Sequence, residues 1–306
     1  DPKQSVPLAN KLIGQDKVVA FVAGSYSLPT RAVSAIFNDE EIPLVSAYAL
    51  HPDITKGDFT FRNGFLGTVE GKGAAYTAVK LLKAKKIALI VSDNDFGTTL
   101  AQGFDEYLKG HPEVKIVSQQ KYPMSEKDFK PYLSKMKATN PDVVFFSGYY
   151  FQVGPAMKQA KEMGIKVQFI GEEGADSPKT TEIAGDAAEG FIMVTNLNRD
   201  DKRKFVQEFL STYRKRHKIE PDMVGASAYD AFMLLANAIK TAKTTDGAAV
   251  AKALANTKNY DGLTGLIKGF TAEGEVVKPV QIQRVKDGKF HYYGVVKDIK
   301  LITPSR

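Results

Sequence analysis

Serine and proline residues follow the first apolar run of the chain in a pattern that suits anion binding. The run covers residues 18–23, and the seven residues from 24 to 30 read Gly-Ser-Tyr-Ser-Leu-Pro-Thr. Ser27 suits the N-cap position of a helix, and Pro29 suits its first turn. Because a helix N-terminus with a hydroxyl can bind a carboxylate, Ser27 is a candidate ligand-binding residue. A cap without any ligand explains the pattern equally well.

Aromatic and acidic residues follow three later apolar runs. Phe96 lies inside the polar turn Asp-Asn-Asp-Phe-Gly, Tyr149 follows the run 143–147, and Glu173 lies in a Gly-Glu-Glu-Gly turn after the run 167–171. Ligands of open parallel sheets bind beyond the carboxyl ends of the strands, which makes all three residues candidates for a ligand site. Taken alone, the Glu173 carboxylate is better explained as a solvated turn residue.

Patterns for catalysis, metal binding and nucleotide binding are missing. The chain has no cysteine, which excludes disulfides, thiolate metal sites and a thiol nucleophile. Its histidines are His51, His111, His217 and His291, and no two of them have metal-ligand spacing. Residues 67–72 are one residue short of a phosphate loop, residues 71–73 lack the third glycine of a dinucleotide fingerprint, and no Gly-x-Ser-x-Gly elbow occurs. We therefore expect no catalytic residue, no metal and no cofactor.

Apolar runs of strand length alternate with amphipathic helical stretches through most of the chain. Strands are predicted at residues 18–23, 43–47, 87–92, 143–147, 167–171 and 190–195. Helices are predicted at residues 5–13, 29–38, 71–82, 98–108, 129–137, 153–163 and 180–184. Continuous apolar strands separated by helices predict an α/β fold with mostly parallel sheets covered on both faces.

The last part of the chain begins with helices and ends with strands. Helical periodicity covers residues 200–217, 222–243 and 247–256, and strand-like runs follow at 263–270, 280–285 and 290–296. A Lys-Asp-Gly-Lys turn at 286–289 predicts a hairpin between the last two runs. No low-complexity linker marks a single domain boundary, as expected if two sheets are built from interleaved segments.

The composition is that of a globular chain large enough for two lobes. The chain has 306 residues, of which 43% are hydrophobic and 25% charged, and its formal net charge is +7. The densest basic cluster, at 202–204 and 214–218, lies among apolar residues at helical spacing, so a solvated helix face explains it best. No apolar run reaches the roughly 18 residues of a membrane span. The start at Asp1, without an initiator methionine, indicates a processed or trimmed chain, and we expect that a signal peptide has been removed.

Short segments along the whole chain resemble the leucine/isoleucine/valine-binding protein family of periplasmic receptors. They recur in the family's order and spacing, and they are residues 1–6, 24–30, 41–46, 95–97, 122–129, 148–150, 183–185 and 188–190. The resemblance implies the type I periplasmic-binding-protein fold, in which three crossovers, expected near residues 68, 197 and 277, join two lobes of doubly wound, mostly parallel sheets. It assigns residues 1–68 and 198–276 to lobe 1, and residues 69–197 and 277–306 to lobe 2. A small ligand is expected between the lobes, which close by a hinge motion.

The resemblance also implies roles for individual loop residues. It places the Ser27 hydroxyl on the ligand carboxylate, the Tyr48 backbone carbonyl on the ligand ammonium, and Glu173 as the counter-charge of that ammonium. The pairing is physically sensible, because a charge buried in a closing cleft needs a partner. The ligand-binding residues expected in this way are Ser27, Tyr48, Ala49, Leu50, Phe96, Tyr149 and Glu173.

Two of these residues depart from the family's pattern. Leu50 stands where the family has a hydroxyl residue that touches both the carboxylate and the ammonium, and Phe96 stands where it often has tyrosine. Each change removes a polar group and keeps an apolar one. The departures favour a ligand that is more apolar, or differently polar, than a branched-chain amino acid.

The start of the chain is a third departure. Family members begin with a strand, a helix and another strand before the Asp-Pro-Lys-Gln segment, so the first lobe is expected to lack this unit. Its central strand position should then be vacant or filled by another segment. Residues 299–304, which read Ile-Lys-Leu-Ile-Thr-Pro, look a little like the missing first strand. The missing unit normally supplies a ligand-contacting loop, so the expected site is incomplete.

These features together predict a binding protein without catalysis. We expect the solute-binding component of an ABC importer, a periplasmic or cell-surface monomer that captures a small amino-acid-like or carboxylate ligand for a membrane permease. No nucleic-acid partner is expected. A ligand-sensing regulatory module of the same fold is an alternative, and the gene neighbourhood would distinguish it from an importer component. A nucleotide-dependent enzyme on a doubly wound fold is a weaker alternative, because its motifs are missing.

Overall fold

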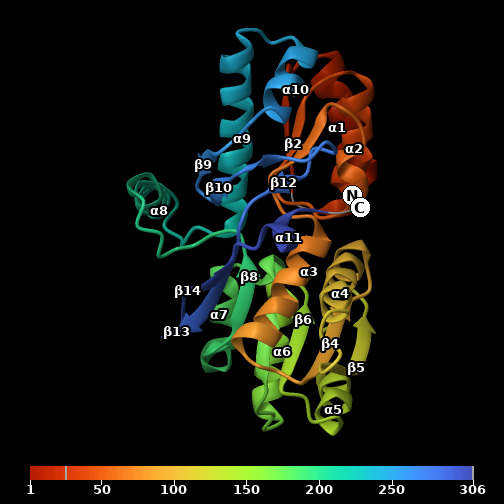
Figure 1. Ribbon diagram of the computed structural model, residues 1–306, viewed down its shortest axis with the longest axis vertical. Coiled ribbons are helices and arrows are strands. Elements are labelled where there is room, and N and C mark those ends of the chain that lie inside the picture. Colours follow the sequence, from red (N-terminus) through yellow and green to blue (C-terminus); the bar gives the residue numbers. More distant parts are fainter. Residues whose placement is uncertain (25, 305–306) are drawn as a thin grey trace. The chain divides into compact units, whose positions relative to one another are not determined.

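The contacts of the chain divide it into two compact units (Figure 1). The computed structural model describes residues 1–24 and 26–304. Unit 1 contains Asp1–Gly67, Val224–Pro279 and the residues from Asp298 onward, and unit 2 contains Thr68–Met223 and Val280–Lys297. Each unit therefore combines segments that are distant in the sequence, as expected for two lobes joined by crossovers.

A mostly parallel sheet forms the centre of unit 2. Within the described residues its strand order is β14-β13-β8-β7-β6-β4-β5. Strands β5, β4, β6, β7 and β8 pair in parallel, and the β13–β14 hairpin joins β8 in the antiparallel sense. The strands are β4 (Lys86–Ser92), β5 (Lys115–Tyr122), β6 (Val143–Ser147), β7 (Gln168–Gly171), β8 (Ile192–Thr195), β13 (Val280–Lys286) and β14 (Lys289–Val296).

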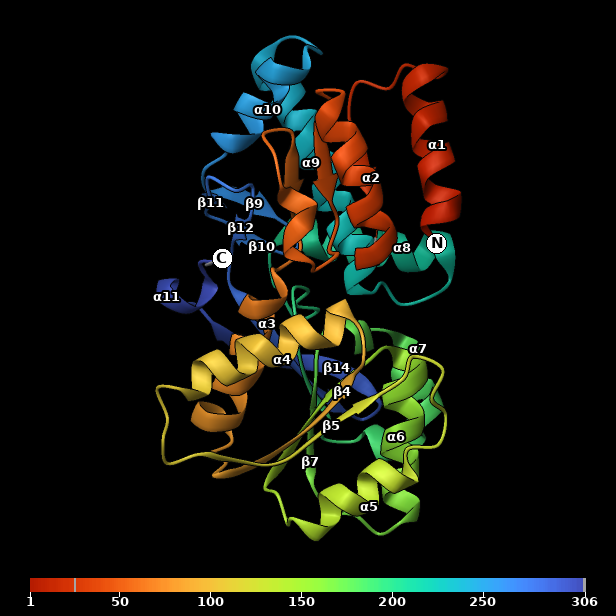
Figure 2. The same ribbon diagram turned by 90° about the vertical axis from the view of Figure 1, so that its right-hand side faces the viewer.

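Helices cover both faces of this sheet, with α3 and α4 on one side and α5, α6 and α7 on the other (Figure 2). This cover explains why every residue of β6, and every residue of β4 after Lys86, is buried. The helical elements are α3 (Gly67–Tyr76), the π-helical turn η2 (Thr77–Leu81), α4 (Asp95–Leu108), α5 (Lys130–Ala138), α6 (Tyr150–Glu162), η3 (Glu173–Ala175), α7 (Pro178–Ala184), η4 (Gly185–Ala188) and α8 (Lys204–His217).

Unit 1 contains a small parallel sheet, in the order β1-β2-β3, and two antiparallel strand pairs, β9–β10 and β11–β12. The strands are β1 (Phe21–Ala23), β2 (Leu44–Ser46), β3 (Thr60–Arg62), β9 (Tyr260–Gly262), β10 (Gly265–Ile267), β11 (Gly269–Phe270) and β12 (Val276–Val277). The helices are α1 (Pro2–Gly14), α2 (Ser27–Asp39), η1 (Pro52–Thr55), α9 (Met223–Ala242), α10 (Gly247–Ala255) and α11 (Ile299–Ile302). Helices α1 and α2 pack side by side (Figure 2), and their apolar faces share a core with β1 and β2.

Strand β1 is an edge strand among the described residues, because it pairs only with β2. Phe21 and Val22 are half-buried, although an apolar strand inside a covered sheet would be fully buried. On α9, the large apolar side chains of Tyr229 and Phe232 are 44% and 62% exposed. An open strand position in the first lobe, which the resemblance implied, stays a prediction. The tail does not fill it as a strand, because Asp298 caps the Lys300 N–H and the chain forms helix α11 there.

The apolar runs and the hairpin turn predicted most strands correctly, but four strands, β3, β5, β9 and β12, were not predicted. The hairpin at 286–289 is confirmed, with positive φ angles at Asp287 and Gly288. Strand β5 was missed because it is an edge strand of mixed exposure whose sequence is Lys-Ile-Val-Ser-Gln-Gln-Lys-Tyr. Strand β3 was missed because it spans only Thr-Phe-Arg, and its charged Arg62 is buried through a specific ion pair rather than through hydrophobicity.

The unit boundaries differ from the expected lobe boundaries at two places. Residues 198–223 group with unit 2, because Arg199 pairs with Asp176 and also donates to the Pro221 carbonyl at 3.2 Å. The residues from Asp298 onward return to unit 1, where Ile302 is fully buried. The other two passages of the chain, at Gly67/Thr68 and Pro279/Val280, lie close to the expected positions.

Candidate ligand-binding site

Ser27 and Leu50 meet at the start of α2 in unit 1. The extended backbone of Tyr26 precedes the helix, so Ser27 is the first helical residue and the prediction that it is the N-cap is wrong. Its Oγ instead accepts a hydrogen bond of 3.2 Å from the Leu50 N–H. The Ser27 hydroxyl keeps a hydrogen that it can donate to a ligand. The neighbouring Ser25 of the same turn lies outside the described residues.

The loop after β2 carries the other candidates of unit 1, which are Tyr48, Ala49 and Leu50, all at most 7% exposed. Arg62 donates to the carbonyl oxygens of Ala49 and His51, the latter at 2.6 Å. The Gly67 N–H donates to the Leu50 carbonyl at 3.3 Å. The carbonyl groups of residues 49–51 are therefore all engaged by protein donors.

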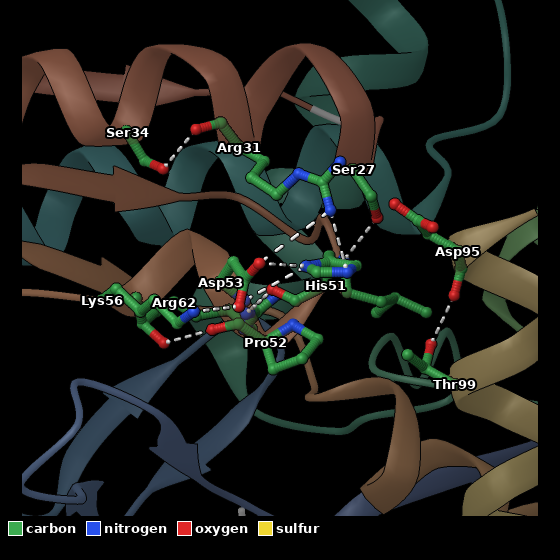
Figure 3. A network of polar contacts seen from close by, with 12 residues as sticks. Ser27, Arg31, Ser34, His51, Pro52, Asp53, Lys56, Arg62, Asp95 and Thr99 are labelled. Atoms are coloured by element: carbon green, nitrogen blue, oxygen red, sulfur yellow. Dashed lines mark hydrogen bonds and ion pairs between the residues drawn. The ribbon is translucent and has the colours of Figure 1, made fainter.

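His51 lies directly after this loop, in a polar network of unit 1 (Figure 3). Its Nδ1 accepts from the Asp53 N–H at 3.1 Å, and its Nε2 lies 3.1 Å from Nη1 of Arg31. Lys56 contacts the Asp53 carboxylate at 2.7 Å, and this hydrogen bond is the main cause that lowers the pKa of Asp53. Arg31 and Lys56 thus bring positive charge to the loop that follows β2.

Phe96, Tyr149 and Glu173 lie together beyond the carboxyl ends of β4, β6 and β7 in unit 2. The Phe96 and Tyr149 rings are stacked, with their centroids 5.0 Å apart and their planes 17° apart. Gly174 has little room for a side chain, because an added Cβ would lie 3.1 Å from the Phe96 ring and 3.0 Å from the Gly148 carbonyl oxygen. This close fit holds the Glu173 turn against the aromatic pair. Each of the three candidates is at most 8% exposed.

Glu172 is a second buried carboxyl group in the same turn. Its two oxygens accept from the Gly148 N–H at 2.8 Å and the Gly174 N–H at 2.6 Å. Burial raises the pKa of Glu172 to about 8, and the two N–H groups act in the opposite direction. These hydrogen bonds join the turn after β7 to the end of β6.

Glu70, on α3, is a third buried carboxyl group of this cluster. Its Oε1 accepts from the Glu173 N–H at 2.9 Å, and its Oε2 has no hydrogen-bond partner in the described part of the chain. Burial raises the pKa of Glu70 well above its usual range, and the charges of Glu173 and Glu172 raise it further. Among the described residues, no cationic side chain forms an ion pair with Glu70 or Glu172.

Asp176 and Asn196 border the cluster in a different way. The Asp176 carboxylate is paired with Arg199 and accepts from the Thr195 hydroxyl at 2.6 Å, so its charge is compensated within unit 2. Asn196 donates from Nδ2 to Oε2 of Glu173 at 3.4 Å. The site of unit 2 therefore combines an aromatic stack with an excess of buried carboxyl groups.

Loop patterns in the sequence did not reveal Glu70, Arg62, His51 or Asn196. Glu70 carries a signal that could have been used, because it stands among apolar and small residues in the Phe-Leu-Gly-Thr-Val-Glu-Gly segment. Arg62 carries no comparable signal, because its role depends on a contact with Glu275, far along the chain.

Metal binding and membrane insertion are two other functions for which the described residues can be searched. The described residues contain no group of three or more metal-ligating acids or histidines. No helix in the described ranges is long and apolar enough to cross a membrane. Unit 1 offers a hydroxyl and a helix N-terminus, and unit 2 offers carboxyl groups beside an aromatic stack. The groups of unit 1 suit an anionic ligand group, and those of unit 2 suit a cationic one.

A protein of two α/β units with polar loops at the ends of parallel strands has the architecture of a type I solute receptor. The chain belongs to the periplasmic binding protein family, because residues 1–289 match the sequence model of that family. The leucine-specific-binding protein of Salmonella typhimurium is 32% identical over 219 residues, which are 70% of this chain and 59% of that protein. The leucine-, isoleucine-, valine-, threonine-, and alanine-binding protein of Pseudomonas aeruginosa is 29% identical over 282 residues, which are 90% of this chain and 73% of that protein. The family predicted from the sequence is confirmed.

Solved structures confirm the predicted fold class. A leucine binding protein from Thermotoga maritima has a TM-score of 0.88 at 25% identity, covering 98% of this chain and 86% of that one. The isoleucine complex of a branched-chain amino acid binding protein from Streptococcus pneumoniae has a TM-score of 0.87 at 28% identity, covering 97% of this chain and 84% of that one. A benzoate complex from R. palustris has a TM-score of 0.86 at 20% identity, with 96% and 82% covered, and shares the fold. The chain aligns with about three fifths (59%) of the length of the leucine-specific relatives.

Proposed function

We propose that this chain is the solute-binding component of an ABC importer, and that it captures an amino-acid-like ligand between units 1 and 2 without catalysis. The family and the names of the relatives support this class of function. The observation that carries the choice of ligand is the carboxyl cluster of unit 2. Glu70 and Glu172 are fully buried, and the described residues supply neither with an ion-pair partner. A cationic ligand group favours the ionised form of these carboxyl groups and can pair with it, whereas a simple anion brings no compensating charge.

The proposed ligand contacts follow from the chemistry of the two units. The Ser27 hydroxyl and the N-terminus of α2 bind the ligand carboxylate, because the helix dipole and a free donor both favour an anion there. Glu173 pairs with the ligand ammonium, and the Tyr48 carbonyl accepts from it. Leu50 and the stacked Phe96 and Tyr149 form apolar walls for the ligand side chain. The expected ligand therefore has an apolar or aromatic side chain.

A ligand that contacts both units favours the closed state over the open state. A ligand shifts a conformational equilibrium only through its differential affinity for the two states. A molecule held by Ser27 of unit 1 and Glu173 of unit 2 makes its full set of contacts only in the closed state. We propose this closure as the event that a membrane permease recognises, on a monomeric protein of the periplasm or cell surface.

A ligand-sensing regulatory module of the same family is the second candidate function. It uses the same site, so binding data do not separate it from an importer component. Neighbouring genes for a permease and an ATPase would support the importer, and a neighbouring signalling protein would support the sensor.

A matched set of ligands tests the proposed site chemistry. L-Leucine carries both charges, leucinamide keeps the amine, 4-methylpentanoate keeps the carboxylate, and benzoate is an aromatic anion. We expect L-leucine or L-phenylalanine to raise the melting temperature most, because a ligand of the folded state stabilises it by mass action. Removal of the amine should weaken binding more than removal of the carboxylate charge. Equal or tighter binding of benzoate or 4-methylpentanoate in calorimetry would overturn the proposal, as would recovery of a chemically altered ligand.

A further inference from the structure

Arg62 is a fully buried cation at the end of β3, and in the described residues the hydrogen bonds of its side chain all lie within unit 1. Its Nε donates to Oε2 of Glu275 at 2.7 Å, and its Nη2 lies 3.3 Å from Oε1. Arg62 and Glu275 are 0% and 1% exposed in this ion pair. Glu275 also accepts from the Thr55 hydroxyl at 2.6 Å. Charges this deeply buried remain stable only when their hydrogen bonds are satisfied.

The rest of the Arg62 guanidinium faces the proposed ligand loop. Nη1 donates to the Ala49 carbonyl, and Nη2 donates to the His51 carbonyl at 2.6 Å. Two carbonyl groups separated by one residue are thus turned toward the same planar cation. Leu50 lies between them, and its N–H points to Oγ of Ser27. The direction of the Arg62 fork therefore sets the orientation of the peptide groups that meet Ser27.

The residue after Arg62 extends this network to the segments where the chain leaves unit 1. Asn63 donates from Nδ2 to the Ser227 carbonyl at 2.9 Å, and its Oδ1 lies 3.5 Å from Nζ of Lys278. Ser227 and Lys278 stand close to the passages at Met223/Val224 and Pro279/Val280. A third of the four passages is at Gly67, whose N–H donates to the Leu50 carbonyl at 3.3 Å. The ligand loop and the unit 1 ends of these three passages are therefore joined by one buried polar network.

The chemistry of the pair indicates a geometric role. A buried ion pair contributes little net stability compared with apolar residues of the same volume, but loss of one partner leaves a buried charge uncompensated. Lysine cannot replace the fork, because it lacks the planar set of donors that reaches two carbonyls and a carboxylate at once. What the Arg62–Glu275 pair provides is a fixed direction for the loop.

We infer that Arg62 is a positioning residue, held by Glu275, that fixes the loop of residues 48–51 to the unit 1 ends of three of the four chain passages. The loop and the passages then move as one body when a ligand binds. The ligand consequence rests on the proposed function, whereas the rigidity of the loop does not.

Hydrogen exchange at the Leu50 amide tests the rigidity directly. In the variant Arg62→Lys, which keeps the charge and loses the fork, we expect exchange at Leu50 at least about tenfold faster than in the native chain. Exchange in α10 and in β9–β10 should stay unchanged. The control is Asp246→Ala, because Asp246 caps α10 in unit 1 and accepts from the Ala249 N–H at 2.9 Å, outside the network of Arg62, Asn63 and Lys278. That variant should speed exchange at Ala249 and leave Leu50 unchanged.

A second variant guards against general destabilisation. The double variant Arg62→Met, Glu275→Leu removes both charges, so no buried charge is left unpaired, and it should fold while still losing protection at Leu50. Unchanged Leu50 exchange in either variant, or an equal increase throughout unit 1, would overturn the inference. Calorimetry with L-leucine provides the functional reading, in which Arg62→Lys should lose about tenfold or more in affinity. If native protein does not bind L-leucine, the proposed ligand is wrong, and the exchange result still decides the role of Arg62.

Discussion

At the scale of a single residue, the variant Glu173→Ala tests whether the ligand carries an amine. Its replacement by alanine would leave the ligand ammonium without its counter-charge in a desolvated place, which costs about 2–5 kcal/mol. This corresponds to a loss of affinity of roughly 30-fold to several-thousand-fold. Calorimetry with the best ligand of the screen measures it. The control Glu182→Ala removes an exposed carboxylate of the same unit and should change affinity little. Unchanged affinity for Glu173→Ala would mean that the ligand is not an amine.

The resemblance places Leu50 in the proposed site, where the family has a hydroxyl residue. Leu50→Thr should improve the binding of leucine-like amino acids, because it restores a hydroxyl that can bridge the ligand's carboxylate and ammonium. Leu50→Val is a matched control, since valine has the shape of threonine without the hydroxyl. Both variants should lower thermal stability, because Leu50 is 1% exposed and shrinking it leaves a cavity. An equal affinity of the two variants for L-leucine would contradict the bridging role.

Glu70 gives the protein a dependence of stability on pH. Burial, and then the charge of Glu173, raise the pKa of Glu70 above its unfolded value of 4.5. Its contribution to stability is therefore fully present below that value and is lost as the pH rises through the folded pKa. Glu172 acts in the same direction up to a pH of about 8. Glu70→Gln removes the ionisation and keeps the Oε1 acceptor for the Glu173 N–H.

The gain in melting temperature of Glu70→Gln over the native chain should thus be small near pH 4.5 and grow toward pH 8, within the window of these two pKa shifts. Asp142→Asn is a control of opposite sign. The N–H groups of Lys85 and Lys86 lower the pKa of Asp142, so its stabilisation is present at neutral pH and lost in acid. Parallel melting curves for native and Glu70→Gln protein at all pH values would show that the Glu70 carboxyl is not perturbed.

The residues that the sequence could reveal are those in loops after apolar strands. Ser27, Phe96, Tyr149 and Glu173 stand out because a polar or aromatic group directly follows a run of strand length. Within each unit the structure brings these candidates together. Glu70 and Arg62 could not be found in this way, because each contacts its loop from another element.

At the scale of elements, fully buried strands were the most predictable. Strand β6 matches its apolar run residue for residue, and β4 differs by the one exposed residue Lys86. Burial on both faces makes every position apolar, so the signal is continuous. Edge strand β5 and the three-residue β3 lack that signal, because neighbouring strands and side-chain pairs rather than hydrophobicity decide their conformation.

The crossing of α3 and α4 leads to a prediction about an element. The helices touch through their backbones, because a Cβ at Gly103 would collide with the Thr68 carbonyl oxygen and one at Gly71 with the Leu100 carbonyl oxygen. Gly103→Ala must therefore push α4 away, at a cost of about 1–3 kcal/mol in the free energy of unfolding. Since α4 carries Phe96 in its first turn, ligand affinity should fall as well.

Urea unfolding measures this cost, with Gly110→Ala as the matched control. The nearest atom to a Cβ at Gly110 is 3.7 Å away, so that variant should stay within about 0.5 kcal/mol of the native chain. If Gly103→Ala proves as stable as Gly110→Ala, the two helices do not rely on their close backbone contact.

At the scale of the whole molecule, length and alternation were enough to predict two interleaved α/β lobes. The position of the second passage was not predictable, because it depends on Arg199, which ties residues 198–223 to unit 2 through Asp176. The residues from Asp298 to Pro304 return to unit 1, where Ile302 is fully buried, and periodicity in so short a segment cannot indicate this.

Closure of the two units is the prediction that belongs to the whole molecule. If one ligand is held by Ser27 of unit 1 and Glu173 of unit 2, saturation with it should make the protein more compact. Small-angle X-ray scattering should then give a smaller radius of gyration with ligand than without. At the same ligand concentration, the radius of gyration of Glu173→Ala should stay close to the ligand-free value, because this variant has lost the contact that stabilises the closed state. A ligand that binds tightly to native protein and leaves the scattering curve unchanged would have to be held by one unit alone, and the hinge mechanism would then be wrong even though the site is real.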